Sequence, residues 1–167
     1  WVNFEQSVQR HETISQVVAR IADCRVAVLT LGLVELWFDH ETGIYLNMAP
    51  SPQMQQLHPD RYSFQVSGFE ENRANMEAIG NLLTACGQND LQIVVTTSPV
   101  PLMATFTNRD VVVANSYSKS ILRAVAEDFA SSRDNAHYFP SYEIVLNSDQ
   151  GIAWAEDGRH VQPEVVH

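Results

Sequence analysis

Helical spacing of apolar residues recurs in three stretches of the chain, which predict helices over Ser7–Cys24, Phe69–Ala85 and Val112–Ser131. In the last stretch, apolar side chains recur every four residues from Val113 to Val125, so they lie roughly along one face. The pattern Ser67-Gly68-Phe69-Glu70 is typical of a capping box at the start of the second helix.

Continuous apolar runs alternate with these helices. Arg25–Leu31 and Leu91–Thr97 predict buried strands, and His137–Phe139 begins a third strand or extended segment. Shorter strands are expected at Ile44–Leu46 and, at an edge, Tyr62–Val66. Buried strands alternating with helices indicate an α/β protein with a mostly parallel sheet covered on both faces. Residues 1–167 contain no repeat or linker, so a single domain is expected.

Three polar segments follow the predicted strands. They are Gly32–Trp37, Thr97–Pro101 and the loop with Asp157 and His160, and Pro163 is expected to start a short terminal helix. Ligands of parallel α/β sheets bind beyond the carboxyl ends of the strands, so the three segments could converge on one site.

The sequence Asp157-Gly158-Arg159-His160 combines an acid and an imidazole three residues apart. Asp157 could fix the tautomer of His160, which could then act as a general base toward a hydroxyl. The alternative interpretation is a polar turn that caps the last helix. The spacing alone is a weak signal and leaves both open.

Other polar residues at these strand ends have two interpretations each. Glu35 could line a site or be a solvated loop residue. Ser98 could be a nucleophile or a hydrogen-bond donor, or it could cap the strand end. Asn115 lies near the start of the long helix, where it could bind a ligand or satisfy free backbone amides. Lys119 and Arg123 share a helix face and could hold a carboxylate or pair with acids such as Glu143 or Glu127.

Charge and composition narrow the possible partners. The chain has 20 acidic and 10 basic residues and a net charge of −10, which argues against nucleic acid and anionic membranes. No apolar run approaches the roughly 18–20 residues that span a bilayer, and no signal peptide opens the sequence. The two cysteines, Cys24 and Cys86, form no disulfide framework, so a reducing, cytoplasmic compartment is the default expectation.

No metal or cofactor is expected. The six histidines are scattered without an HExxH pair, and neither a GxGxxG nor a P-loop pattern occurs.

Five ordered blocks resemble the GSCFA domain family. They are TLGLVELW at 30–37, TTSPVPLMATF at 96–106, VVVANSYSKSILRAVA at 111–126, YFPSYEIV at 138–145 and DGRHVQPEVV at 157–166. That family is related to the SGNH, or GDSL-like, hydrolases. The resemblance implies a flavodoxin-like three-layer α/β/α fold and ester chemistry, either hydrolysis or acyl transfer. Carbohydrate esters are a plausible substrate class.

The resemblance also implies roles for single residues. Asp157 and His160 match the block that supplies the acid and base of a Ser-His-Asp triad. Gly32–Glu35 takes the place of a Gly-x-Asn-Asp block, but Val34 stands where an asparagine would stabilise the oxyanion. Backbone amides near Gly32 could substitute for that side chain.

The family's Gly-Ser-Cys stretch, which would carry the nucleophile, does not occur in the 167 residues. The polar start without methionine indicates that this stretch lies upstream, and its absence would leave the sheet without its first strand and with an apolar edge. The first hypothesis is therefore an SGNH-like esterase or acyltransferase in which Gly32, Glu35, Ser98 and Asn115 line the pocket. The second is a non-catalytic binding or structural domain that keeps the fold. A third uses Ser98 as the nucleophile and requires a hydrogen bond between its hydroxyl and His160.

Overall fold

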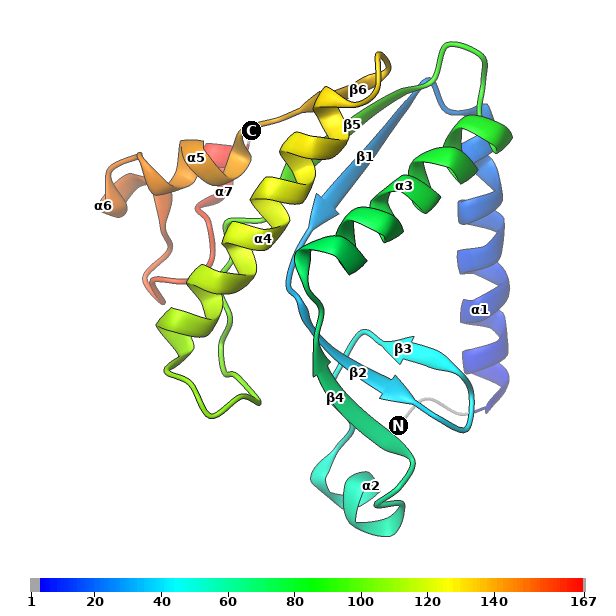
Figure 1. The fold of residues 1–167 in the computed structure, drawn as a ribbon, viewed down its shortest axis with the longest axis vertical. Helices are drawn as coiled ribbons and strands as arrows, with labels where there is room; N and C mark the ends of the chain where they lie inside the picture. The colour runs from blue at the N-terminus through cyan, green and yellow to red at the C-terminus, as the bar shows by residue number, and fades with distance from the viewer. Residues whose placement is uncertain (1–3, 167) are drawn as a thin grey trace.

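Three parallel strands form the centre of the molecule. In the computed structural model, which describes residues 4–166, they are β1 (Val26–Leu31), β5 (Gln92–Thr97) and β6 (Ala136–Tyr138), in the order β1-β5-β6 (Figure 1). The prediction of an α/β protein with a parallel sheet is confirmed. The sheet forms because apolar runs of this length can be buried when helices cover them.

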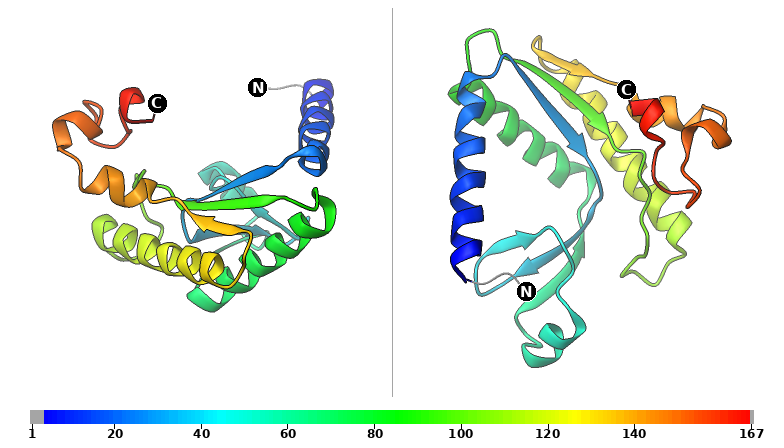
Figure 2. Two further views of the ribbon diagram at one scale, coloured as in Figure 1. Left: turned by 90° about the horizontal axis from the view of Figure 1, so that it is seen from above. Right: turned by 180° about the vertical axis from the view of Figure 1, so that it is seen from behind.

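Two long helices cover one face of this sheet. They are α3 (Phe69–Cys86) and α4 (Val111–Ser131), which lie side by side beneath the strands in Figure 2. Ile93 and Val95 of β5 pack against Val125 and Phe129 of α4, and all four side chains are at least 98% buried. Burial of a side chain of this size stabilises a fold by about 1.5–3 kcal/mol, so this contact holds α4 in place.

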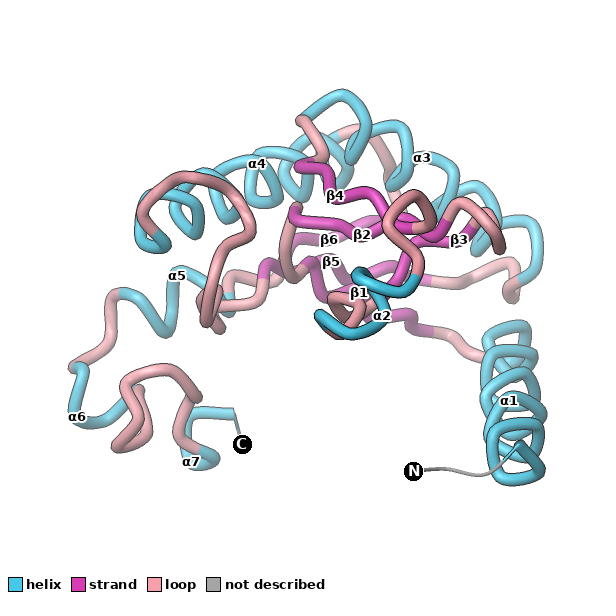
Figure 3. The backbone as a smooth tube through the Cα atoms, turned by 90° about the horizontal axis from the view of Figure 1, so that it is seen from below, coloured by secondary structure: helices cyan, strands magenta, loops and turns pink. Residues whose placement is uncertain are grey.

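The opposite face of the sheet is more open. Val26 and Val28 of β1 point away from the core and keep 53% and 64% of their surface exposed. Helix α1 (Phe4–Ala19), which continues as the 3-10 helix η1 (Arg20–Asp23), stands at one side of the sheet, and the C-terminal segments stand at the other (Figure 3). Among residues 4–166 the structure therefore shows one complete helix layer of the two that were expected.

A second, antiparallel sheet was not predicted. It has the order β3-β2-β4, with β3 at Ile44–Leu46, β2 at Glu35–Asp39 and β4 at Tyr62–Val66. The short helix α2 (Pro52–Leu57) lies between β3 and β4. The strands β3 and β4 are where the sequence predicts them, whereas no strand is predicted for the segment that forms β2.

The predicted capping box before α3 is wrong. Gly68 is the N-cap residue and makes no side-chain cap hydrogen bond. Ser67 is buried, and its hydroxyl donates to the Val34 carbonyl oxygen and accepts from Asn72 Nδ2. A contact between distant segments has displaced the local motif.

After β6 the chain forms three short helices. They are α5 (Ser141–Leu146), α6 (Gln150–Ala153) and α7 (Pro163–Val166). Only the last was predicted, because α5 and α6 are too short to show apolar periodicity. No helix within residues 4–166 has the length and hydrophobicity needed to cross a membrane.

Candidate functional site

The loop between α6 and α7 is a closed turn. Trp154 and Val161 form an antiparallel β-bridge across it, and the Ala155 amide donates to the His160 carbonyl oxygen at 2.8 Å. Gly158 has a φ of +63°, a left-handed conformation that glycine adopts without the strain that a Cβ would bring. The sequence of the turn therefore determines where Asp157 and His160 lie.

Asp157 holds His160 through backbone and ring together. Its Oδ1 accepts from the backbone amides of Arg159 at 3.0 Å and His160 at 2.9 Å, and its Oδ2 lies 2.5 Å from His160 Nδ1. The amide and ring of His160 and the amide of Arg159 hold the pKa of the Asp157 carboxyl well below its usual range. The carboxylate thus stays ionised and can stabilise a charged imidazole.

The other ring nitrogen of His160 is available. Within residues 4–166, Nε2 makes no hydrogen bond, and the side chain is 62% exposed. An imidazole with one nitrogen fixed by an acid and the other unoccupied has the geometry that general-base catalysis needs.

A cavity of about 670 Å³ lies against this turn. Its walls come from the loop after β5, from α4, α5 and α6, and from the turn itself, with Glu156 and Gly158 among the lining residues. Tyr142 and Trp154 supply aromatic surface. Burial and the charge of Glu143 raise the pKa of Tyr142, so its hydroxyl remains protonated.

Ser98 and Asn115 both shape the loop that forms one wall of this cavity. The Ser98 hydroxyl accepts from the Val100 amide at 3.3 Å, which is the strand-ending role considered as the alternative. Asn115 lines the cavity, and its Oδ1 accepts from the Leu102 amide at 3.0 Å. No hydrogen bond joins Ser98 to His160 among the described residues, so the requirement for Ser98 as the nucleophile is not met.

Glu35 and Gly32 lie apart from this cavity. The Glu35 carboxylate accepts from the Thr105 hydroxyl at 2.5 Å and the Phe106 amide at 3.1 Å, so it anchors the loop that follows β5. Glu35 also borders a second, smaller cavity of about 380 Å³. Gly32 follows β1 directly, next to Ser98, whose amide donates to the Leu31 carbonyl oxygen.

The model of the GSCFA family matches residues 4–167, nearly the whole chain. The chain belongs to the GSCFA family. No curated protein and no solved structure matches it.

Two residues of this GSCFA chain bind the segment that follows β1, and the sequence does not predict either contact. Ser118 and Lys119 of α4 contact the Gly32–Val34 segment: the Val34 amide donates to Ser118 Oγ at 3.1 Å, and Lys119 Nζ donates to the Gly32 carbonyl oxygen at 2.8 Å. Lys119 is 1% exposed. The helical spacing of Lys119 and Arg123 predicts a shared cationic face. In the structure, Lys119 binds the Gly32 carbonyl oxygen, whereas Arg123 binds Glu143.

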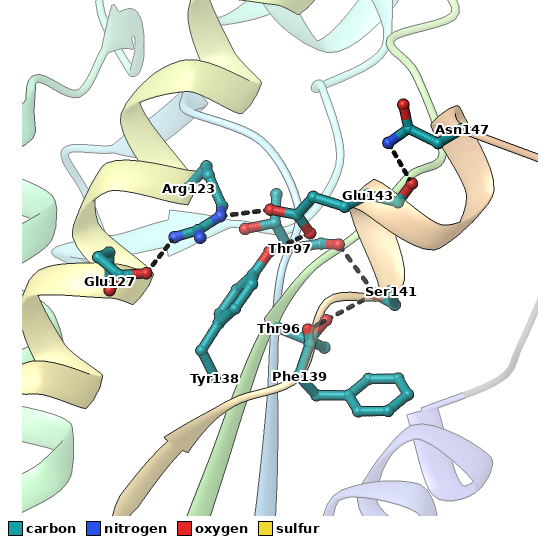
Figure 4. A network of polar contacts seen from close by, with 9 residues as sticks. All are labelled: Thr96, Thr97, Arg123, Glu127, Tyr138, Phe139, Ser141, Glu143 and Asn147. Carbon is teal, nitrogen blue, oxygen red and sulfur yellow. Dashed lines mark hydrogen bonds and ion pairs between the residues drawn. The ribbon is translucent and has the colours of Figure 1, made fainter.

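Arg123 takes part in a network that fixes α5 (Figure 4). Its guanidinium pairs with Glu143 at 2.5 Å and Glu127 at 2.8 Å, and it lies 3.9 Å from the centre of the Tyr138 ring. The ion pairs considered from the sequence are therefore present. Because α5 carries Tyr142, this network holds one wall of the GSCFA domain's larger cavity.

Hydrogen bonds at the start of α5 complete this attachment. The Ser141 hydroxyl lies 2.5 Å from Thr96 Oγ1 and donates to the Thr97 carbonyl oxygen at 3.1 Å (Figure 4). These bonds join α5 to the end of β5. Both exposed cysteines, Cys24 and Cys86, are free, and no group of three or more metal-ligating side chains gathers within residues 4–166.

Proposed function

We propose that this GSCFA domain belongs to an SGNH-like esterase or acyltransferase in which His160 is the general base and Asp157 orients it. The observation that carries the proposal is the Asp157–His160 pair, with Nδ1 bound to the acid and Nε2 unoccupied. An acid that stays ionised stabilises the imidazolium that forms when the base takes a proton. In this interpretation the fold is the three-layer SGNH arrangement.

The reaction would proceed through two proton transfers at His160. The base removes the proton from a serine or cysteine that the 167 residues do not supply, and that atom forms a bond to the ester carbonyl carbon. When the tetrahedral intermediate collapses, the ester C–O bond breaks and the imidazolium returns the proton to the leaving alcohol. Water or a second hydroxyl then takes the acyl group by the same steps in reverse.

The cavity beside the turn favours an uncharged, hydroxyl-rich substrate. Its lining combines the aromatic rings of Tyr142 and Trp154 with the amides of Asn115, Gln150 and Gln162. Glu156 is its acid, and none of the described residues that line it is a lysine or arginine, so an anionic ligand would find no counter-charge there. Aromatic faces and amide groups suit a sugar ring, which supports an O-acyl carbohydrate as substrate.

The test uses the full-length protein and p-nitrophenyl acetate. His160→Ala should abolish ester turnover, because it removes the imidazole that takes the nucleophile's proton. His58→Ala is the matched control, since His58 is exposed and makes no side-chain hydrogen bond among the described residues. Turnover by His160→Ala at the rate of the control would sink the assignment.

A binding or structural role is the second candidate. Val34 occupies the place of the oxyanion asparagine, and its side chain is 1% exposed within the core, so it packs rather than meets a ligand. If His58→Ala and the unaltered protein both lack ester turnover but bind an acetylated oligosaccharide, this candidate replaces the first.

A further inference from the structure

The second cavity, of about 380 Å³, lies where the antiparallel sheet meets the start of α4. Val34, Val66 and Ala114 form its apolar walls, and two of these side chains, Val34 and Ala114, are 1% and 6% exposed. Its polar groups come from Glu35, the first residue of β2, and from residues 107–109, which precede α4. Small-molecule sites usually have volumes of roughly 300–1,000 Å³, so this cavity suits a small ligand with both apolar and polar parts.

Arg109 brings an unpaired positive charge to this cavity. Among residues 4–166 its guanidinium makes no ion pair and no side-chain hydrogen bond, and the residue is exposed, so a ligand can reach it. The guanidinium lies 5.4 Å from the centre of the Tyr117 ring, which also lines the cavity, and the Arg109 amide donates to Thr107 Oγ1 at 3.3 Å. Because a guanidinium binds a carboxylate through two parallel N–H bonds, Arg109 can receive the carboxylate of a ligand.

Glu35 brings the opposite charge. Its two oxygens accept from the Thr105 hydroxyl and the Phe106 amide, which fixes the carboxylate against the loop that leads to Arg109. These bonds occupy two of the roughly four lone-pair positions of a carboxylate, so the group can still accept from a ligand. Within the described part of the chain no cation pairs with Glu35, and Arg109 does not do so either. An acid and a base therefore line one cavity without neutralising each other.

We propose that this cavity binds a zwitterionic α-amino acid with a small apolar side chain. The carboxylate of the ligand binds Arg109, its ammonium group binds Glu35, and its side chain packs on the apolar walls. Such a ligand carries a counter-charge for each of the two groups, whereas a simple anion or cation would leave one of them facing a like charge. The cavity shares no lining residue with the one beside the turn of Asp157 and His160, so the inference does not depend on the proposed function.

The test compares three ligands that differ by one charged group. They are L-valine, isovalerate, which lacks the ammonium group of valine, and isobutylamine, which lacks its carboxylate. Each is titrated into the ¹⁵N-labelled protein at pH 7 and constant ionic strength, and binding is followed by NMR. The amide signals of Glu35 and Arg109 should move and saturate with L-valine. Isovalerate and isobutylamine should each bind at least about tenfold more weakly, because each loses one charge-assisted contact.

A substitution at Arg109 tests the assignment of the two charges. Arg109→Gln should weaken L-valine binding at least about tenfold and leave isobutylamine binding unchanged, so that the two ligands bind this variant equally. Arg109 makes no side-chain hydrogen bond among residues 4–166, so the variant should fold like the native chain. Arg20→Gln is the matched control: it removes the same charge from another exposed residue, which lines neither cavity, and should leave L-valine binding unchanged.

Three results would overturn the proposal. In the native chain, these are amides that do not move with L-valine, or binding of L-valine that is no tighter than that of isovalerate or isobutylamine. In the variants, it is L-valine binding by Arg109→Gln equal to that of Arg20→Gln. Amino-acid binding requires neither His160 nor a nucleophile, so loss of ester turnover in His160→Ala and loss of L-valine binding in Arg109→Gln are independent outcomes.

Discussion

Replacing Glu143 by glutamine removes one charge from the network that attaches α5 to α4 and β6 while keeping the shape of the side chain. In the native protein, Glu143 Oε1 accepts from Arg123 Nε at 2.5 Å, and Oε2 accepts from the Tyr138 hydroxyl at 2.7 Å. Both bonds go to a charged acceptor. Glutamine keeps one oxygen, so at most one of these two bonds survives, and its acceptor is then uncharged.

The expected cost follows from exposure. A hydrogen bond to a charged group contributes about 1.5–3 kcal/mol where water is excluded. The side chains of Arg123 and Glu143 are 31% and 36% exposed, so solvent screening reduces this contribution. We therefore expect Glu143→Gln to lower the free energy of unfolding by about 1–2 kcal/mol. Glu127→Gln breaks the other ion pair of Arg123, but Glu127 is 58% exposed, and its loss should cost about 0.5 kcal/mol or less.

The effect should depend on pH in a defined direction. Partial burial acts to raise the pKa of Glu143, but the Tyr138 hydroxyl and Arg123 outweigh it and lower the pKa below the ordinary value of 4.5. A carboxyl with a lowered pKa stabilises the fold above its ordinary pKa and loses that contribution as the pH falls through the folded value. The difference in the free energy of unfolding between the native chain and Glu143→Gln should therefore be largest at pH 7 and should decrease below about pH 4.

Urea unfolding followed by circular dichroism at 222 nm measures these differences, provided that the dependence on urea concentration has the same slope in all three proteins. The reasoning is refuted if Glu143→Gln is no less stable than Glu127→Gln at pH 7. It is also refuted if the gap between Glu143→Gln and the native chain stays the same between pH 7 and pH 3.5.

Two further substitutions test contacts of α3 and β2 that hold the fold together. Alanine at Gly80 should gain about 1 kcal/mol from helix propensity but lose about 1–3 kcal/mol from overpacking, because its Cβ would lie 2.7 Å from Phe129. In thermal unfolding, the melting temperature of Gly80→Ala should equal or fall below that of the native chain. Ala78→Gly, on the exposed side of the same helix, measures the effect of helix propensity alone. A raised melting temperature in Gly80→Ala would contradict the close approach of α3 to α4. The Arg61 guanidinium lowers the pKa of Asp39 to about 2. Asp39→Asn should therefore lower the melting temperature at pH 7, and the difference from the native chain should shrink toward pH 2. Equal melting temperatures at pH 7 would disprove the role of that ion pair.

The parts of the fold that follow local rules could be predicted. The apolar run that forms β5 and the regular spacing along α4 identify a buried strand and its covering helix, because periodicity and burial are linked directly. The strand β2 could not be found in this way. Acidic residues such as Glu35 and Asp39 are typical of loops. In the structure, Glu35 accepts from the Phe106 amide and Asp39 accepts from Arg61, and both contacts join segments far apart in the sequence.

The same division holds at the candidate site. The Asp157–His160 contact could be predicted because three residues and a glycine turn suffice to form it. The burial of Lys119 could not be predicted, since its spacing to Arg123 is typical of an exposed helix face. Only the packing of α4 against the end of β1 determines that one of these cations is buried and the other is not.

The span of the turn that holds Asp157 and His160 has a consequence for folding. Closing a loop costs conformational entropy that rises with the number of residues enclosed, and here the two side chains are three residues apart. The acid and the base can therefore meet early, before distant strands have paired. Mutations that weaken the sheet should leave the pair assembled, whereas the cavity beside it, which is built from five segments of the chain, should come apart first.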